Sequence, residues 1–224
     1  MNGGEAKKRL GVLVSGSGSN LQALIDACAQ PDYPAELAVV ISNVPTAFAL
    51  ERARRANVSA VALDHKSFAD REAFDAELVA ALRAHRVDVV CLAGFMRLVG
   101  KSFLDAFPQR VLNIHPSLLP AFPGLHGPRQ AVKHGAKVAG CTVHFVDAGL
   151  DSGPIIAQAA VPVLPEDTEE TLAARILIQE HQLYPLAVRW LCEGRIEIRD
   201  RTVHVRGGAP AIDAHALRSP GGAR

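Results

Sequence analysis

Two polar side chains close a short apolar strand in the middle of the chain. Asn113 and His115 follow Val111 and Leu112 and are two positions apart, so in an extended backbone they point to the same side. An amide donor with a protonated imidazole beside it could stabilise the oxyanion that forms when an acyl group is transferred. The alternative is a strand end with a capping amide and a half-buried histidine, and these residues alone leave both interpretations open.

The chain that follows this strand is stiff. Residues 116–127 contain three prolines and two glycines. Proline excludes continued helix or strand pairing, and glycine permits turns that other residues resist. We therefore expect an extended loop over residues 116–127, the central loop. Its stiffness indicates that it positions other groups.

A glycine loop near the start of the chain is a second candidate site. An apolar strand over residues 9–14 is followed by Ser-Gly-Ser-Gly-Ser-Asn at residues 15–20, the glycine loop, and then by helical spacing from Leu21. Backbone N–H groups and the helix dipole can converge there on a phosphate, although a serine-capped turn is the alternative. Leu21 stands where a dinucleotide fingerprint needs glycine, and no lysine follows as in a P-loop, so a single phosphate fits best.

The surrounding pattern predicts an α/β fold. Strands and helices alternate up to residue 110, which indicates a doubly wound, mostly parallel, Rossmann-like sheet. Strands expected at 138–146 and 155–161 have no helix between them, so the sheet should become mixed and partly antiparallel. We expect one domain over residues 1–205, with a phosphate-binding half at 9–110, a catalytic half at 111–205, and a disordered tail at 206–224.

Further candidates lie where strands should end or where a charge is unusual. The apolar run 87–93 reads as a buried parallel strand that delivers residues 94–99 to the same sheet edge as Asn113. Asp147 and Asp151 are candidate site residues in a glycine-rich connection at 147–154, the Asp151 loop. The alternative is that these acids only close the loop as Asx turns. Arg71 falls in the first turn of a helix, where a cation is disfavoured, so it has either an anionic partner or the ordinary role of a surface arginine, which is the more common case.

Composition excludes several classes of protein. The chain has 224 residues, 49% of them hydrophobic, and a formal net charge of +1, so no basic footprint for nucleic acid or an anionic membrane is present. Neither a membrane-spanning run of about 20 apolar residues nor a signal peptide is recognisable. Four widely spaced cysteines suit buried reduced thiols better than disulfides or a metal site. We therefore expect a cytoplasmic protein.

Several motifs together resemble the folate-dependent formyltransferases, and among them the phosphoribosylglycinamide formyltransferase family. The resemblance covers residues 9–205. Its motifs are Ser-Gly-Ser-Gly-Ser-Asn-Leu-Gln-Ala at 15–23, Ser-Asn at 42–43, Leu-Glu-Arg-Ala-Arg at 50–54, Leu-Ala-Gly-Phe-Met-Arg at 92–97, Asn-Ile-His-Pro-Ser-Leu-Leu-Pro at 113–120, Leu-Asp-Ser-Gly-Pro at 150–154 and Gln-Glu-His at 179–181.

The resemblance implies roles for individual residues. It implies that Asn113, His115 and Asp151 are catalytic. It implies substrate-binding residues that hold the phosphate and ribose of phosphoribosylglycinamide, namely Gly18, Ser19, Asn20 and Glu180. It also implies residues that line the pocket for 10-formyltetrahydrofolate, namely Arg71, Met96, Arg97, Leu98, Val99 and Asp147.

The implied reaction is formyl transfer from 10-formyltetrahydrofolate to the glycinamide amine in purine synthesis. Small-molecule substrates, no metal, no nucleic acid, no membrane and a monomer or homodimer are then expected. A 10-formyltetrahydrofolate hydrolase and a sugar-nucleotide formyltransferase remain alternatives. Methionyl-tRNA formyltransferase would need a further basic domain, and a non-catalytic nucleotide-binding regulator would leave Asn113, His115 and Asp151 without a purpose.

Overall fold

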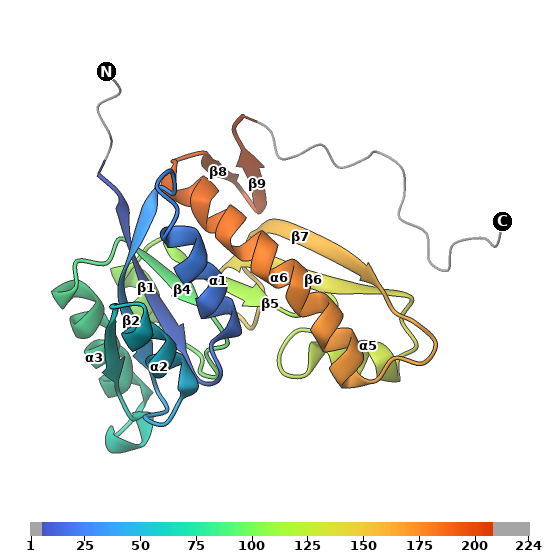
Figure 1. Cartoon of the computed structure of the whole chain (residues 1–224), viewed down its shortest axis with the longest axis horizontal. Coiled ribbons are helices and arrows are strands. Elements are labelled where there is room, and N and C mark those ends of the chain that lie inside the picture. The colour runs from blue at the N-terminus through green and yellow to red at the C-terminus, as the bar shows by residue number, and fades with distance from the viewer. Residues whose placement is uncertain (1–5, 208–224) are drawn as a thin grey trace.

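A computed structural model describes residues 6–207, which form a seven-stranded sheet, a separate two-stranded hairpin and covering helices (Figure 1). All but the first two residues of the predicted tail 206–224 lie outside the described residues. The strands are β1 (Lys8–Val14), β2 (Ala35–Ser42), β3 (Ser59–Ala62), β4 (Val89–Leu92), β5 (Val111–His115), β6 (Val138–Phe145), β7 (Ile155–Pro162), β8 (Ile196–Arg199) and β9 (Thr202–Val205). The α-helices are α1 (Ser19–Cys28), α2 (Phe48–Arg55), α3 (Arg71–Ala84), α4 (Lys101–Ala106), α5 (Gly127–Lys133) and α6 (Glu169–Cys192).

The sheet is doubly wound and becomes antiparallel at one side. Its strand order is β3-β2-β1-β4-β5-β6-β7. The pairs from β3 to β5 are parallel, whereas β5 with β6 and β6 with β7 are antiparallel. The predicted fold class, mostly parallel with a mixed C-terminal half, is confirmed. The strand order runs in opposite directions on the two sides of the β1/β4 pair, and such reversal points are where open α/β sheets bind ligands.

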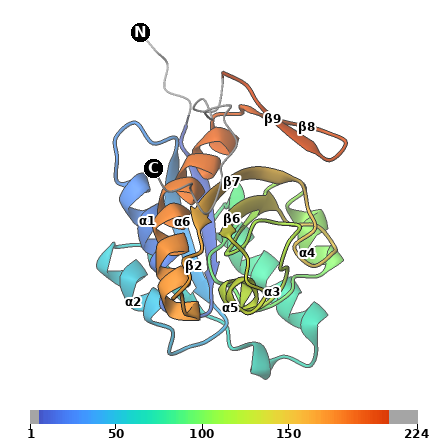
Figure 2. The ribbon, with the colours of Figure 1, turned by 90° about the vertical axis from the view of Figure 1, so that its right-hand side faces the viewer.

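Two hydrophobic cores cover the two faces of the sheet. One contains Leu21 and Leu24 of α1 with Leu172 and Ile176 of α6, and the other contains Phe74, Leu78 and Leu82 of α3 with Phe103 of α4. Figure 2 shows α1 and α6 on one side of the sheet and α3 and α4 on the other. Strand β4 is buried along its whole length, which explains its continuous apolar sequence.

Helix α4 was not predicted. It spans only six residues, and Phe103 is its one buried residue. A segment of fewer than two turns cannot show the repeated apolar spacing that identifies a helix in sequence. Among residues 6–207, no helix has both the length and the apolar character needed to cross a membrane.

Tyr184 connects helix α6 to the two strands that lead into the site. Its side chain is fully buried, and its hydroxyl oxygen lies 2.9 Å from the carbonyl oxygen of Leu92 and 3.1 Å from that of Leu112. The hydroxyl therefore donates to the backbone of both β4 and β5. A buried hydroxyl without a partner would be costly, so this contact fixes the register of α6 over both strands.

Tyr184→Phe is expected to lower the free energy of unfolding by about 1–2 kcal/mol, because two buried carbonyls lose their shared donor. Urea unfolding followed by circular dichroism measures the change. Tyr33→Phe is the matched control, since its hydroxyl donates to a single carbonyl, that of Pro185 in α6. An equal or larger loss in the control would show that the strand contact has no special weight.

Candidate active site

The carboxyl ends of β1, β4 and β5 meet at one edge of the sheet. Ser15, directly after β1, donates from its hydroxyl to the side-chain oxygen of Asn43 at 2.6 Å, and accepts from the backbone N–H of Met96 at 2.8 Å. One serine thus joins the segments that follow β2 and β4 on either side of the reversal point. The glycine loop, residues 94–99 and the end of β5 therefore share this edge.

Asp151 brings the three predicted catalytic residues together. Its Oδ2 lies 3.4 Å from Nδ1 of His115, and its Oδ1 lies 3.5 Å from Nδ2 of Asn113. The structure thus joins two strand residues to an acid 36 positions beyond His115. The same Oδ2 accepts a 2.8 Å hydrogen bond from the backbone N–H of Gly124 in the central loop. The carboxylate therefore links β5, the central loop and the Asp151 loop.

The backbone at Asp151 is strained, and neighbouring contacts hold it. Its φ is +48°, in the left-handed region that costs a non-glycine residue about 1–2 kcal/mol. In the next residue, the carbonyl of Ser152 accepts a hydrogen bond from the guanidinium of Arg201, in the turn between β8 and β9. The contacts of the carboxylate and this bond compensate for the strain and keep the side chain over the strand ends.

His144 completes this group, and sequence analysis missed it. Its Nε2 lies 3.2 Å from Nδ2 of Asn113, and its Nδ1 lies 2.8 Å from the carbonyl oxygen of Phe145. Burial lowers the pKa of His144, so the ring is neutral near pH 7, donates from Nδ1 and accepts from the Asn113 amide at Nε2. The available signal was the antiparallel pairing of β5 and β6, in which Asn113 and His144 are direct partners.

His115 faces an oxygen acceptor on each side of its ring. Nε2 lies 3.0 Å from the carbonyl oxygen of Phe122, and Nδ1 faces the Asp151 carboxylate. Only the imidazolium form can donate from both nitrogens. The arrangement thus suits a positive charge at His115, whereas His144 next to it is neutral.

The glycine loop leaves the N-terminus of α1 uncapped. Gly18 is the N-cap residue, with φ +73°, and no side chain caps the helix there. A Cβ at Gly18 would lie 2.7 Å from the Cβ of Ala49 in α2, so both its conformation and its surroundings require glycine. The first-turn N–H groups of Ser19 and Asn20 have no side-chain cap, which is the arrangement that binds anions.

Asn20 and Glu180 form a buried pair behind this helix terminus. Nδ2 of Asn20 donates to Oε2 of Glu180 at 2.6 Å, and Oδ1 of Asn20 has no hydrogen-bond partner within residues 6–207. Burial raises the pKa of Glu180, and the bond from Asn20 opposes that shift only in part. A buried acid with few partners is typical of a site that a polar ligand completes.

The residues predicted to line a folate pocket divide into two groups. Met96 and Leu98 are more than half exposed, and so are Leu125 of the central loop and Leu150 of the Asp151 loop. Val99 differs, because it is buried in the α3/α4 core. Asp147 accepts hydrogen bonds from the backbone N–H of Gly149 and the hydroxyl of Ser152, so it closes its own loop as an Asx turn does.

Arg71 has an acidic neighbour that sequence analysis missed. Asp75 is buried, and its Oδ2 accepts a 2.6 Å bond from the backbone N–H of Gly100. Burial raises the pKa of Asp75, while this bond and the positive charges of Arg71 and Arg97 lower it. The sequence did contain a signal for Asp75, because an acid one helical turn after Arg71 falls on the apolar, buried face of α3. Asp75 is therefore bonded to the backbone at Gly100, directly after residues 96–99, with the charges of Arg71 and Arg97 nearby.

The chain is similar to known proteins over most of its length. A family profile described as "Formyl transferase" matches residues 8–188. The chain belongs to the formyl transferase family. This membership confirms the resemblance predicted from the sequence and makes the chain an enzyme of the folate-dependent formyltransferase class. Within residues 6–207 of this formyl transferase, no group of three or more histidine, cysteine or acidic side chains is arranged to hold a metal ion.

Named relatives agree with the family. The formyl transferase is 46% identical over 196 residues to phosphoribosylglycinamide formyltransferase of Escherichia coli, covering 88% of this chain and 92% of that protein. It is 57% identical to glycinamide ribonucleotide transformylase 1 from Symbiobacterium toebii, whose crystal structure it matches with a TM-score of 0.89. This match covers 91% of this chain and 99% of that one. It is 50% identical to the trifunctional purine biosynthetic protein adenosine-3 of Drosophila melanogaster over 85% of this chain, but spans only 14% of that protein.

Glu180→Gln is expected to raise the free energy of unfolding at pH 7.5, by roughly 1 kcal/mol, because a buried charge is removed and the bond from Asn20 is kept. Since the pKa of Glu180 is raised on folding, its charge opposes folding above the unfolded pKa. The gain should therefore shrink as the pH falls toward 4.5. Urea unfolding at several pH values measures it.

Glu170→Gln in the same helix is the control. Its carboxylate is exposed, and hydrogen bonding to Thr168 lowers its pKa, so this substitution should not stabilise the fold. A gain at Glu170 equal to that at Glu180 would show that burial is not the cause.

Proposed function

We propose that the chain transfers the formyl group of 10-formyltetrahydrofolate to the amine of 5-phosphoribosylglycinamide, a step of purine synthesis. Formyl transferase membership supports the reaction class. The observation that carries the proposal is the contact of Asp151 with both Asn113 and His115, at the sheet edge that also holds the uncapped N-terminus of α1. Such an edge can bind a phosphate at one end and transfer an acyl group at the other.

The reaction needs three events at the formyl carbon. The neutral glycinamide amine attacks it, a C–N bond forms, and the carbonyl oxygen becomes an oxyanion. The bond from the formyl carbon to the folate nitrogen then breaks. The amine loses one proton and the departing nitrogen gains one, so the overall transfer is balanced and no covalent enzyme intermediate is needed.

Asn113 is the proposed donor to the oxyanion. One N–H of its amide is held by Nε2 of His144, and the second faces Oδ1 of Asp151 only at 3.5 Å, a long contact that a carbonyl oxygen could replace. Neutral His144 thereby sets the amide so that nitrogen, and not oxygen, faces the site. Preorganised donors of this kind are worth about 3–4 kcal/mol in the transition state.

His115 and Asp151 are proposed to act as a charged pair. The imidazolium would stabilise the oxyanion through its charge, since both of its N–H groups already face oxygen acceptors. The Asp151 side chain is 13% exposed, so it can reach a water molecule or the attacking amine. It would accept the amine proton and pass it to the departing nitrogen.

The remaining residues are proposed to hold the two substrates. N–H groups of Gly18, Ser19 and Asn20 would bind the phosphate, and Glu180 would accept hydrogen bonds from the ribose hydroxyls. The exposed apolar side chains of Met96 and Leu98 would line the folate pocket. Arg71, Arg97 and Asp147 would complete it, with the guanidinium groups available to the folate carboxylates, and buried Val99 would support the pocket from the α3/α4 core.

The domain and cellular assignments are proposed with the activity. Residues 1–205 would act as one unit, with halves at 9–110 and 111–205. The enzyme would work in the cytoplasm on small molecules as a monomer or homodimer. A 10-formyltetrahydrofolate hydrolase would share the Asn113 group, and a sugar-nucleotide formyltransferase would need a larger acceptor site than one phosphate loop supplies.

Absorbance at the folate bands tests the proposal. Tetrahydrofolate should form from 10-formyltetrahydrofolate only when phosphoribosylglycinamide is added. Asn113→Ala and His115→Ala should each lower kcat by about 10²–10³-fold, because each removes a group that stabilises the oxyanion. His204→Ala, at an exposed position of β9, should retain wild-type activity.

Equal deformylation with and without the ribonucleotide would identify a hydrolase. A folded wild-type protein that catalyses neither reaction would refute the proposal. A full loss of activity in His204→Ala would show that the assay responds to general damage.

A further inference from the structure

We propose that Arg52 of helix α2 is a phosphate-positioning residue that makes the enzyme select the phosphorylated form of its acceptor. The inference rests on the proposed function, because the proposed function assigns the substrate phosphate to the glycine loop. It concerns a side chain outside the loop, and three observations carry it: two hydrogen bonds, a peptide orientation and a positive charge next to the site.

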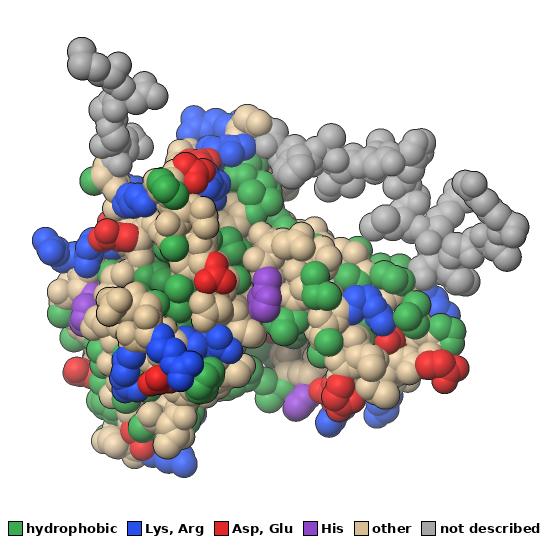
Figure 3. Space-filling model, in the orientation of Figure 1, with side chains coloured by type: hydrophobic (Ala, Val, Ile, Leu, Met, Phe, Trp, Pro, Cys, Tyr) green, Lys and Arg blue, Asp and Glu red, His purple; other side chains and the backbone are tan. Residues whose placement is uncertain are grey.

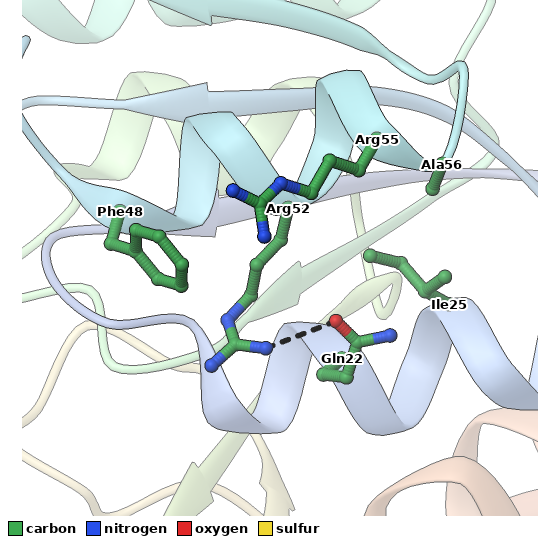
Figure 4. Close-up of a pocket in the computed structure, with 6 residues that line it drawn as sticks. All are labelled: Gln22, Ile25, Phe48, Arg52, Arg55 and Ala56. Atoms are coloured by element: carbon green, nitrogen blue, oxygen red, sulfur yellow. Dashed lines mark hydrogen bonds between the residues drawn. The ribbon is translucent and has the colours of Figure 1, made fainter.

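The Arg52 side chain fastens α2 to the glycine loop and to α1. Its Nε donates to the carbonyl oxygen of Ser17 at 2.8 Å, and its Nη1 donates to Oε1 of Gln22 at 3.1 Å. Its Cδ lies 3.5 Å from the point that a Cβ on Gly18 would occupy. Figure 4 shows Arg52 reaching from α2 to Gln22 of α1. The guanidinium therefore lies directly against the loop.

The bond to Ser17 sets the direction of a loop N–H group. In a trans peptide, the carbonyl of one residue and the N–H of the next point in opposite directions. Because the Ser17 carbonyl points to Arg52, the N–H of Gly18 points away from it, on the side proposed for the phosphate. Removing the guanidinium would free this peptide to rotate and would withdraw a preorganised donor.

The charge of Arg52 acts across the loop peptide that separates it from the proposed phosphate position. Its hydrogen bonds use Nε and Nη1, and Nη2 has no hydrogen-bond partner within residues 6–207. The pKa of His181, next to Glu180 in α6, is lowered mainly by burial and further by Arg52. Nε2 of His181 is buried without a partner in the described part of the chain. A dianionic phosphate on the other side of the peptide would therefore be attracted by an incompletely neutralised cation.

A surface hollow places Arg52 in contact with solvent. The hollow has a volume of about 260 Å³ and is lined by Gln22, Ile25, Phe48, Arg52, Arg55 and Ala56. The guanidinium carbons of Arg52 and Arg55 lie 5.0 and 5.7 Å from the centre of the Phe48 ring. Figure 3 shows Lys and Arg side chains gathered in the area that α2 occupies in Figure 1. Arg55 also pairs with Glu51, whereas Arg52 is the one directed to the loop.

Arg52→Gln and Arg55→Gln form a matched pair for a test by steady-state kinetics. Both substitutions remove a positive charge of α2 that lies over the Phe48 ring, but only Arg52 contacts the glycine loop. The acceptors are phosphoribosylglycinamide and its dephosphorylated nucleoside. Arg52→Gln should lower kcat/KM for the phosphorylated acceptor by roughly 10–100-fold, the effect of losing a charged hydrogen-bonding group, and change that for the nucleoside less than twofold. Arg55→Gln should change neither, and Arg52→Lys should restore part of the loss.

Three outcomes would overturn the inference: unchanged kinetics in Arg52→Gln, equal losses with both acceptors, or an equal selective loss in Arg55→Gln. If the wild type transfers no formyl group, the proposed function fails instead. Thermal unfolding in inorganic phosphate then decides the role of Arg52 by itself. Phosphate should raise the Tm of wild type and Arg55→Gln but not of Arg52→Gln, and an equal rise in all three would refute the role.

Discussion

The position of the Asp151 carboxylate is the constraint on which the site depends. It is mostly buried, and it meets Asn113 and His115 of β5, His144 of β6 at 3.7 Å, and the backbone of Gly124. Burying a carboxylate is costly unless polar groups surround it, so these contacts favour one arrangement of both loops. The antiparallel pairing of β5 with β6 is what lets two strands supply its partners.

The rest of the fold brings a second polar region to the same edge. Ser15 joins the ends of β2 and β4 to β1, and Asn20 joins α1 to α6 through Glu180. Glu180 is buried with its pKa raised, which opposes folding at neutral pH. A buried acid that lowers the stability of the fold, next to an uncapped helix N-terminus, is typical of a ligand-binding site.

Much of this could be predicted because it depends on local pattern. The buried run that became β4, the glycine loop and the antiparallel β6/β7 pair each follow from periodicity and turn residues. His144 was missed because its partner Asn113 lies on another strand, and Asp75 was missed because its hydrogen bond goes to Gly100, 25 residues further along the chain. Nothing in the sequence singles out Arg52, since sequence does not show that α2 packs against the glycine loop. Contacts between distant segments have no signature in one sequence.

A crystal structure with phosphoribosylglycinamide and a non-transferable folate analogue tests most directly whether one sheet edge serves both substrates. We expect the phosphate on the N–H groups of Ser19 and Asn20, the ribose at Glu180, and the amine beside Asn113 and Asp151. A phosphate bound instead at Arg71 and Arg97, or an amine outside hydrogen-bond reach of Asp151, would contradict it.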